Sequence, residues 1–329
     1  MELPTPAGWV RPVNEVSLDI AAGESLGLVG ESGSGKTMLA LALMGLLPAG
    51  ARVKGQAWLR QGIAIAAGGA SPAARGPSGA DRSGRNLAAL SEKEWRVVRG
   101  GEIAMVFQEP MTSLNPVMRI GAQIEEAIRA HESGLAAGDV KRRAAEALRR
   151  AAVPEPEARA EQFPHQLSGG LRQRAMIAMA LAAGPRVLIA DEPTTALDVT
   201  VQKQILDLLD QLRRELRLGL LFITHDLGVV AEVADRVAVM YAGRIVEQGP
   251  APEVLAAPRH PYTQGLLNAS PTLERGKLSP IPGAVPQLTA LPPGCAFEPR
   301  CGLRRAECTV AVPDLRAADA NHKARCVLL

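Results

Sequence analysis

A glycine-rich loop between a short apolar strand and an apolar helix restricts this chain to few folds. The segment Gly30–Thr37 reads Gly-Glu-Ser-Gly-Ser-Gly-Lys-Thr and matches the pattern G-x-x-x-x-G-K-[ST]. The apolar strand 26–29 precedes it, and an apolar segment, 36–47, follows it and stops at Pro48. Glycines let backbone N–H groups point into one cavity, and the N-terminus of a helix adds positive charge there. The loop therefore predicts a phosphate-binding site.

Two side chains at the end of this loop are suited to a nucleotide. Lys36 would reach the β- and γ-phosphates, and the hydroxyl of Thr37 would bind Mg²⁺. The predicted ATP-binding residues of the loop are Gly30, Ser32, Gly33, Ser34, Gly35, Lys36 and Thr37.

A second apolar strand ends in a pair of carboxylates. Val187–Ala190 is followed by Asp191 and Glu192. Asp191 would hold Mg²⁺ directly or through water. Glu192 would face an attacking water, which it would polarise or deprotonate as a general base. Beside the glycine-rich loop, this pair predicts nucleotide hydrolysis.

Leu167-Ser168-Gly169-Gly170 precedes another apolar helix. Ser168 is suited to cap that helix, and two glycines leave its positive end open. The segment predicts a second anion site. Because one nucleotide needs only one glycine-rich phosphate loop, a second site suggests a nucleotide held between two subunits.

Apolar strands alternating with helices indicate an α/β core with a parallel sheet. Asp139 is expected to cap one of the helices. The segment 62–85, rich in Gly, Ala and Ser, predicts a flexible surface insertion. Strands are expected at 16–20, 26–29, 187–190 and 220–223, with a hairpin at 237–247, and helices at 36–47, 122–131, 139–152, 169–183 and 199–216.

Composition excludes several classes of protein. The net charge of +3 is too balanced to indicate nucleic-acid binding, and aromatic residues are only 3% of the chain. No apolar run is long enough to span a bilayer, and the N-terminus lacks the pattern of a secretory signal. We therefore expect the protein in the cytoplasm, without nucleic acid as a partner.

At this point the chain resembles the ATPase subunits of ABC transporters over roughly residues 3–257. The glycine-rich loop, Gln108, the Leu167–Gly170 signature, the strand ending at Glu192, Asp198 and His225 occur in the family's order. The resemblance implies a P-loop ABC ATPase core with an antiparallel β subdomain and an α-helical subdomain at about 109–183.

The resemblance also implies roles for single residues. Gln108 would sense Mg²⁺ and the γ-phosphate, so Mg²⁺ would be held by Thr37, Gln108 and Asp191. His225 would contact the γ-phosphate. Lys36, Glu192 and His225 are thus the expected catalytic residues. Contacts across a dimer to the partner's ATP would come from Ser168, Gly169, Gly170 and Asp198.

A narrower resemblance is to the ATPases of oligopeptide and dipeptide importers, a family that also includes importers of nickel and glutathione. The motifs that carry it lie at 108–116, 171–174, 194–200 and 260–263 and in the tail segment 293–301. It implies an ATPase bound to the cytoplasmic face of the inner membrane. Its partners would be a second ATPase chain, identical or related, two permease subunits and, indirectly, a solute-binding protein.

Four cysteines occur only in the last 35 residues, after the composition changes near 258. Their spacing lacks a C-x₂-C pair, yet four thiolates are a full set for zinc or a [4Fe–4S] cluster. Four idle thiols are the alternative, and a reducing compartment disfavours disulfides. Some members of the resembling family carry an iron–sulfur cluster here, which favours [4Fe–4S] over Zn²⁺. The cysteines are Cys295, Cys301, Cys308 and Cys326, and the basic neighbours suited to an anionic site are Arg300, Arg304, Arg305 and Arg325.

We therefore expect an ABC ATP-binding domain over 1–257 and a C-terminal extension over 258–329. The expected function is ATP hydrolysis that energises the import of peptides or a related small solute. The alternatives are a soluble ABC ATPase of DNA repair or translation, a non-enzymatic regulatory module in which the cassette only senses ATP, and an importer ATPase for nickel or glutathione.

Overall fold

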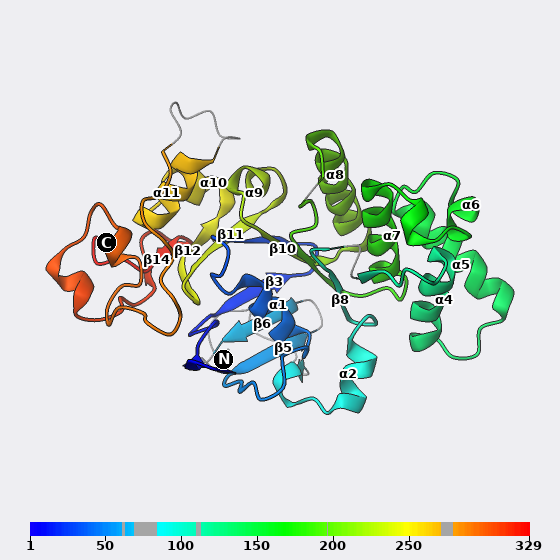
Figure 1. Ribbon diagram of the computed structural model, residues 1–329, viewed down its shortest axis with the longest axis horizontal. Helices are drawn as coiled ribbons and strands as arrows, with labels where there is room; N and C mark the ends of the chain where they lie inside the picture. Colours follow the sequence, from blue (N-terminus) through cyan, green and yellow to red (C-terminus); the bar gives the residue numbers. More distant parts are fainter. Residues whose placement is uncertain (61–62, 69–83, 110–112, 196, 271–278) are drawn as a thin grey trace. The chain divides into compact units, whose positions relative to one another are not determined.

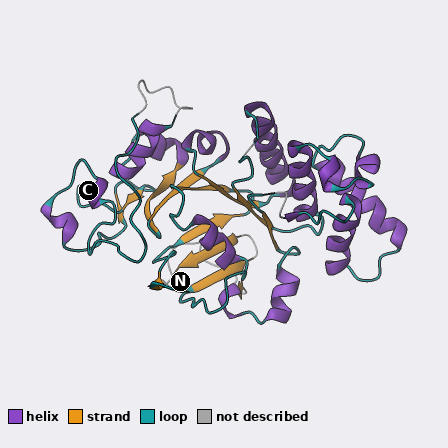
Figure 2. Ribbon diagram, in the orientation of Figure 1, coloured by secondary structure: helices purple, strands orange, loops and turns teal. Residues whose placement is uncertain are grey.

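The computed structural model describes residues 1–60, 63–68, 84–109, 113–195, 197–270 and 279–329. These residues form two compact units. The first unit comprises 1–20, 25–89 and 222–329, and the second unit comprises 21–24 and 90–221. Strands and helices alternate along both units, as Figure 2 shows. The predicted α/β class is confirmed.

The first unit contains the β4 strand that precedes the glycine-rich loop. β4 lies parallel to β11, and β11 forms an antiparallel hairpin with β12. A second sheet has the order β3-β6-β5-β7. The strands are β1 (Leu3–Thr5), β2 (Gly8–Val10), β3 (Leu18–Ala21, of which Ala21 falls in the second unit), β4 (Ser25–Val29), β5 (Gln56–Arg60), β6 (Ile63–Gly68), β7 (Gly84–Asn86), β11 (Arg236–Tyr241), β12 (Arg244–Pro250), β13 (Arg316–Ala317) and β14 (Lys323–Ala324).

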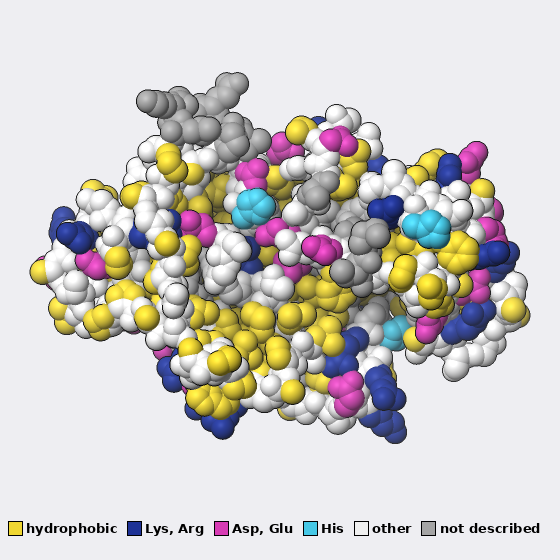
Figure 3. All heavy atoms as spheres, in the orientation of Figure 1, with side chains coloured by type: hydrophobic (Ala, Val, Ile, Leu, Met, Phe, Trp, Pro, Cys, Tyr) yellow, Lys and Arg dark blue, Asp and Glu magenta, His cyan; other side chains and the backbone are white. Residues whose placement is uncertain are grey.

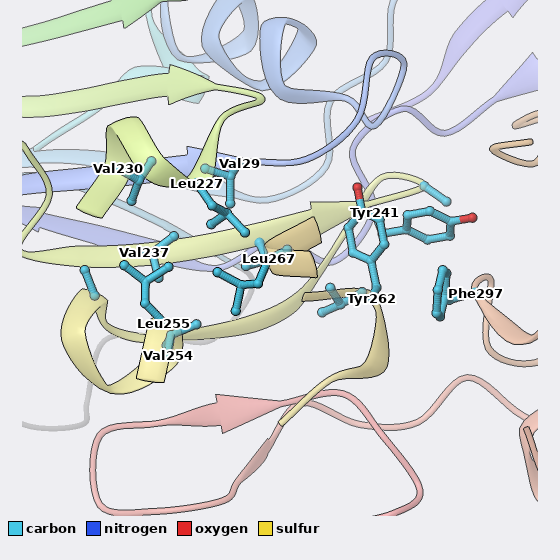
Figure 4. Close-up of a cluster of buried hydrophobic side chains, with 14 residues drawn as sticks. Val29, Leu227, Val230, Val237, Tyr241, Val254, Leu255, Tyr262, Leu267 and Phe297 are labelled. Atoms are coloured by element: carbon cyan, nitrogen blue, oxygen red, sulfur yellow. The ribbon is translucent and has the colours of Figure 1, made fainter. Parts of the chain in front are cut away.

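Helices cover one side of the β11–β12 hairpin, where Figure 1 shows α9, α10 and α11. Their apolar side chains pack with those of β4 and β11 into one buried cluster, drawn in Figure 4. The helices of this unit are α1 (Lys36–Leu43), α9 (Leu227–Val233), α10 (Ala251–Ala256) and α11 (Pro261–Ala269), with short 3₁₀ turns at Leu87–Ala89, Glu298–Arg300 and Ala306–Thr309.

In the second unit, β8 and β9 are parallel neighbours, with Val106 opposite Ala190. Its helices are α2 (Glu92–Val98), α4 (Ile120–His131), α5 (Ala137–Arg150), α6 (Pro156–Ala160), α7 (Gly169–Leu181) and α8 (Val199–Leu216), with a 3₁₀ turn at Pro164–Gln166; the strands are β8 (Ile103–Val106) and β9 (Val187–Asp191). The residues of β10 (Gly219–Thr224) are divided between the two units. Among the described residues, no helix combines the length and the hydropathy needed to cross a bilayer.

The surface of α4, α5 and α6 carries charges of both signs, which lie side by side in Figure 3. Lys141 pairs with Glu161 at 2.9 Å, and Arg149 pairs with Glu157 at 2.6 Å. Exposed pairs of this kind contribute little to folding stability, because water screens the two charges. The buried apolar stripe of α5, formed by Val140, Ala144 and Leu148, is therefore the larger contribution to its packing.

Helix α8 shows how closely a sequence pattern can set an element. The side chain of Asp198 accepts a hydrogen bond from the Val201 N–H at 2.9 Å. The apolar residues that recur on the buried face are Ile205, Leu208, Leu209 and Leu212. Arg217 ends the helix in a left-handed conformation. The helix has the bounds predicted from the sequence, 199–216, because it is capped at both ends and has a continuous apolar stripe.

The helices expected at 122–131, 139–152 and 169–183 differ from α4, α5 and α7 by two residues at one or both ends. Three larger differences have a clear physical cause. α1 ends at Leu43 rather than 47, because Gly45 turns left-handed and the Leu46 N–H bonds back to the Leu41 carbonyl. The residue that caps α5 is Ala136, and Asp139 instead pairs with Arg142 at 3.0 Å within the first turn.

The third difference concerns the expected insertion at 62–85. Its two ends are strands β6 and β7, both paired with β5, so those parts belong to a sheet. Residues 62 and 69–83 lie outside the described part of the chain. The Gly- and Ala-rich composition concealed these strands, because neither residue type is enriched in sheets.

The tail, residues 258–329, belongs to the first unit, and one buried carboxylate holds part of it there. Glu247 on β12 is fully buried, and its oxygens accept hydrogen bonds from the backbone N–H groups of Arg259 at 2.5 Å and His260 at 2.9 Å. His322 Nε2 lies 2.7 Å from the same carboxylate. β14 extends the sheet beside it, with Ala324 opposite Glu247. Two separate segments of the C-terminal region, 259–260 and 322–324, therefore meet at Glu247.

His260 gives a pH-dependent contribution to folding stability. Burial, together with the nearby positive charge of Arg325, lowers its pKa from 6.5 to about 3, and its Nδ1 accepts the N–H of Tyr262 at the start of α11. Between pH 6.5 and 3 the unfolded chain binds a proton at His260 that the folded chain does not bind. Stability therefore falls as the pH is lowered through this range.

We predict that His260→Gln flattens the loss of stability between pH 7 and pH 5. The part of the free energy of unfolding due to His260 is about 2 kcal/mol over this range, at 1.36 kcal/mol per pKa unit. Denaturant unfolding at the two pH values measures it. His165→Gln, at an exposed histidine, is the matched control. An equal pH slope in wild type and His260→Gln would contradict the assignment.

Candidate functional site

The glycine-rich loop of the first unit is shaped by close backbone approaches. A Cβ atom on Gly30 would lie 2.2 Å from the Met240 carbonyl oxygen, and one on Gly35 would lie 2.0 Å from the Pro12 carbonyl oxygen. Both glycines also have positive φ angles, 156° and 108°. Only glycine meets both demands, so these two positions fix the loop between β4 and α1.

Lys36 begins α1 and is buried within the loop. Its Nζ donates to the carbonyl oxygens of Gly30 at 2.6 Å and Glu31 at 3.1 Å. No side chain caps the N-terminus of α1, and Thr37 beside it is exposed. The hydroxyl of Ser34 is buried and has no hydrogen-bond partner among the described residues. An open helix N-terminus, a lysine and an orphaned hydroxyl are a donor set that fits phosphate groups.

Glu31, the second residue of the loop, is held by the C-terminal region. Its N–H donates to the hydroxyl of Tyr262 at 2.8 Å, and its carboxylate pairs with Arg300 at 2.7 and 3.0 Å. Arg300 was expected to neighbour the cysteines, and its contact with Glu31 was not predicted. The motif Pro299-Arg300-Cys301 was its only signal.

In the second unit, Gln108 and Glu192 come together. β8 and β9 are parallel neighbours, so the residues that follow their carboxyl ends meet. Gln108 Nε2 donates to Glu192 Oε2 at 3.0 Å, and the hydroxyl of Thr195 donates to the same oxygen at 2.9 Å. Asp191, one residue earlier, is 1% exposed.

Glu192 has a strained backbone. Its φ of 46° lies in the left-handed region, which is uncommon for a residue other than glycine. Residues held in such conformations cluster at functional sites, where the fold maintains the strain. Together with its two hydrogen-bond donors, this conformation fixes the direction of the carboxylate.

The signature segment lies beside the start of α8. Ser168 caps α7 by accepting the Leu171 N–H at 3.4 Å. A Cβ on Gly170 would come 2.7 Å from a methyl group of Val201, in the first turn of α8 that Asp198 caps. Ser168, Gly169 and Asp198 are exposed. The structure thus brings the signature and the α8 N-terminus together in the second unit.

His225 follows β10 in the first unit and is exposed. The next residue, Asp226, caps α9 by accepting the Gly228 N–H at 2.7 Å. Lys36 and His225 thus belong to the first unit, whereas Gln108, Asp191, Glu192, Ser168–Gly170 and Asp198 belong to the second.

A family model described as "ABC transporter" matches residues 13–195. The chain belongs to the ABC transporter family. A second model, "Oligopeptide/dipeptide transporter, C-terminal region", matches residues 246–308.

Relatives and a solved structure agree with this assignment. A Brucella melitensis protein, whose name describes a peptide import ATP-binding protein, is 51% identical and covers 98% of this chain and 93% of its own length. A Brucella abortus protein with the same description is 46% identical, covering 94% and 87%. The solved dimer of the ATP-binding cassette MJ0796 with ADP and phosphate has a TM-score of 0.61 at 26% identity, covering 76% of this chain and 95% of that one. The resemblance predicted from the sequence is confirmed, and the chain is an ATPase of the ABC transporter family.

The cysteines of this ABC ATPase lie around one small pocket. Cys295, Cys301, Cys308, Cys326 and His260 line a cavity of about 20 Å³, space for one water molecule. No disulfide joins the four thiols. Burial, with smaller effects from neighbouring thiols, raises the pKa of Cys295 and Cys301, which favours their protonated forms.

The predicted iron–sulfur or zinc site is not supported by this geometry. Within the described residues, no group of three or more His, Cys, Asp or Glu side chains is arranged to hold a metal ion. Arg300 does not serve the cysteines but pairs with Glu31, and Arg325 donates to the carbonyl oxygens of Ile245 and Pro313. Arg300 and Arg325 thus each make a contact with a residue outside the tail, Glu31 and Ile245.

We predict that Lys36→Ala abolishes nucleotide binding. The ammonium group is the one side-chain cation inside the phosphate loop, and alanine leaves no donor in its place. Calorimetric titration of the purified chain with Mg-ATP measures the loss. Lys93→Ala, at an exposed lysine of α2, is the control. Tight binding by Lys36→Ala would overturn the assignment of this loop.

Proposed function

We propose that this ABC ATPase uses ATP hydrolysis to drive the uptake of peptides through a membrane transporter. The observation that carries the proposal is the match of residues 246–308 to the C-terminal region of oligopeptide and dipeptide transporters. The chain segment before it carries the glycine-rich loop, Gln108, the Leu167–Gly170 signature, the Asp191–Glu192 pair and His225. The relatives' names, which describe peptide import, support the same substrate class.

The proposed ATP site uses the loop residues predicted from the sequence. The backbone N–H groups of 30–37 and the α1 N-terminus bind the phosphates, and Lys36 exchanges its two carbonyl partners for phosphate oxygens. Thr37, Asp191 and Gln108 would hold Mg²⁺, which neutralises phosphate charge when bound. The open helix N-terminus and the orphaned Ser34 hydroxyl support this assignment.

Glu192 is the proposed group that orients the attacking water or accepts its proton. Its carboxylate is directed by Gln108 and Thr195, so a change in Gln108 on nucleotide binding reaches Glu192 through one hydrogen bond. His225 is proposed to contact the γ-phosphate. In this scheme two chains close over two nucleotides, each chain presenting Ser168, Gly169, Gly170 and Asp198 to the partner's ATP. The exposure of Ser168, Gly169 and Asp198 supports it.

The proposed assembly contains a second ATPase chain, identical or related, two permease subunits and a solute-binding protein. The chain would bind the permease from the cytoplasmic face of the membrane. We also propose the division into a nucleotide-binding domain, 1–257, and an extension, 258–329. The four cysteines are given no step in this function; iron, zinc and acid-labile sulfide analysis of the purified chain tests for a cluster or a zinc site.

We predict that Glu192→Gln preserves ATP binding but lowers ATP turnover of the assembled transporter by about 100-fold or more, because an amide cannot accept the proton. The isosteric control is Glu215→Gln on the exposed side of α8. Steady-state phosphate release measures the effect. Normal turnover by Glu192→Gln would remove this residue from the catalytic role.

Uptake into vesicles tests the substrate class. We expect the reconstituted transporter, with its solute-binding protein, to accumulate a labelled tripeptide and to hydrolyse ATP faster in its presence. Accumulation of Ni²⁺ or glutathione instead of the peptide would replace the substrate but leave the transport function. Failure of the chain to associate with any membrane subunit would favour a soluble ABC ATPase.

A further inference from the structure

Arg300 in the tail uses its guanidinium group to bind the phosphate loop. Its side chain is 5% exposed, and its two terminal nitrogens pair with the two carboxylate oxygens of Glu31. Nε donates to the Pro282 carbonyl oxygen at 2.9 Å, and Nη1 also lies 3.3 Å from the Tyr241 hydroxyl. A two-pronged pair of this kind fixes direction as well as distance.

Glu31 is held by both the loop and the tail. Its carbonyl oxygen accepts from Lys36 Nζ and from the Ser34 N–H at 3.2 Å. Its own N–H and its carboxylate go to Tyr262 and Arg300. The same residue therefore carries the contacts of the phosphate-binding lysine and the contacts of the C-terminal region.

Aromatic packing fixes the two tail residues that hold Glu31. Tyr241, Tyr262 and Phe297 meet with ring centroids 4.5–5.3 Å apart, and Figure 4 shows the three rings together at one end of the buried cluster. The guanidinium carbon of Arg300 lies 5.9 Å from the rings of both Tyr241 and Phe297. Arg300 is therefore placed by packing that is independent of Glu31.

The position of Arg300 affects nucleotide binding because Glu31 is negatively charged. An unpaired carboxylate in the phosphate loop would repel the phosphates of ATP. It would also be free to compete for Lys36. Arg300 neutralises the carboxylate and turns it toward the tail, which leaves the loop with a net positive charge from Lys36.

We propose that Arg300 is a positioning residue of the ATP site, through which the C-terminal region sets the affinity of the phosphate loop for nucleotide. The inference rests on the proposed binding of ATP to this loop. Arg300 acts through Glu31 and does not itself touch the nucleotide. The tail thereby contributes to nucleotide binding.

The test is Mg-ATP affinity of the full-length chain, measured by calorimetric titration. We expect Arg300→Gln to raise the Kd about tenfold or more, because it leaves the half-buried Glu31 carboxylate in the phosphate loop without its partner, where its charge repels the phosphates. Arg300→Lys, which keeps the charge but loses the two-pronged geometry, should have an intermediate Kd. Arg304→Gln is the matched control, since Arg304 lies in the same segment, is mostly exposed and pairs only weakly with Glu298 at 3.7 Å.

A double variant separates positioning from general loosening of the fold. Glu31→Gln removes the repulsive charge, so Arg300→Gln/Glu31→Gln should regain most of the affinity that Arg300→Gln loses. In the assembled transporter, Arg300→Gln should raise the KM for ATP more than it lowers kcat. A double variant as weak as Arg300→Gln, or an Arg300→Gln chain with wild-type affinity, would overturn the proposal.

The same titrations distinguish this inference from the proposed function. A wild-type chain that fails to bind Mg-ATP would refute the ATP site itself. A wild-type chain that binds, with Arg300→Gln binding equally well, would refute only the role of Arg300. If Arg300→Gln does not fold, the comparison of Arg300→Lys with Arg304→Lys decides.

Discussion

The first unit depends on how closely the phosphate loop approaches the backbone around it. Carbonyl oxygens of Pro12 and Met240 occupy the places where side chains on Gly35 and Gly30 would begin. The loop is also tied by the Gly243 N–H, which donates to the Ser34 carbonyl oxygen at 2.9 Å. Gly243 lies at the turn between β11 and β12, so this hydrogen bond joins the hairpin directly to the loop. The shape needed to bind phosphate is thus set by backbone contacts before any ligand arrives.

The C-terminal region also depends on contacts with the β11–β12 hairpin and the phosphate loop. Glu247, in the hairpin, gathers β14, His322 and the start of α11. Tyr262, also at the start of α11, then reaches the second residue of the loop. A buried carboxylate is costly unless it is fully paired, and Glu247 meets this condition only when the tail is folded. Folding of the tail and completion of the first unit are therefore linked.

Much of this architecture could be predicted from the sequence. α8, β9 and the β11–β12 hairpin follow from apolar periodicity, capping residues and the turn at Ala242-Gly243, all of which act over a few residues. The glycine-rich loop, Asp191 and Glu192 were recognisable because their motifs are local too. β6 and β7 were missed because their pairing with β5 does not show in their composition.

Contacts between segments that are distant in the sequence could not be predicted either. Glu31 and Arg300 are 269 positions apart, and a lone arginine beside a cysteine gives no sign that its partner is a glutamate in another motif. The cysteines are a different case. The described structure gathers all four around one small cavity, but the metal site that their number predicted is not supported, because no group of three or more His, Cys, Asp or Glu side chains among the described residues is arranged to hold an ion.

The buried aromatic cluster has a consequence for how this chain can be divided. Phe297 packs against Tyr241 of the sheet, and Tyr262 reaches from the composition break at 258 into the phosphate loop. A shortened chain that stops at that break would retain each nucleotide-binding motif in its sequence. It would also expose Tyr241 and leave Glu31 without Tyr262 and Arg300. The boundary in composition is therefore not a place where the polypeptide can be cut into independent modules, because the phosphate loop and the tail complete each other.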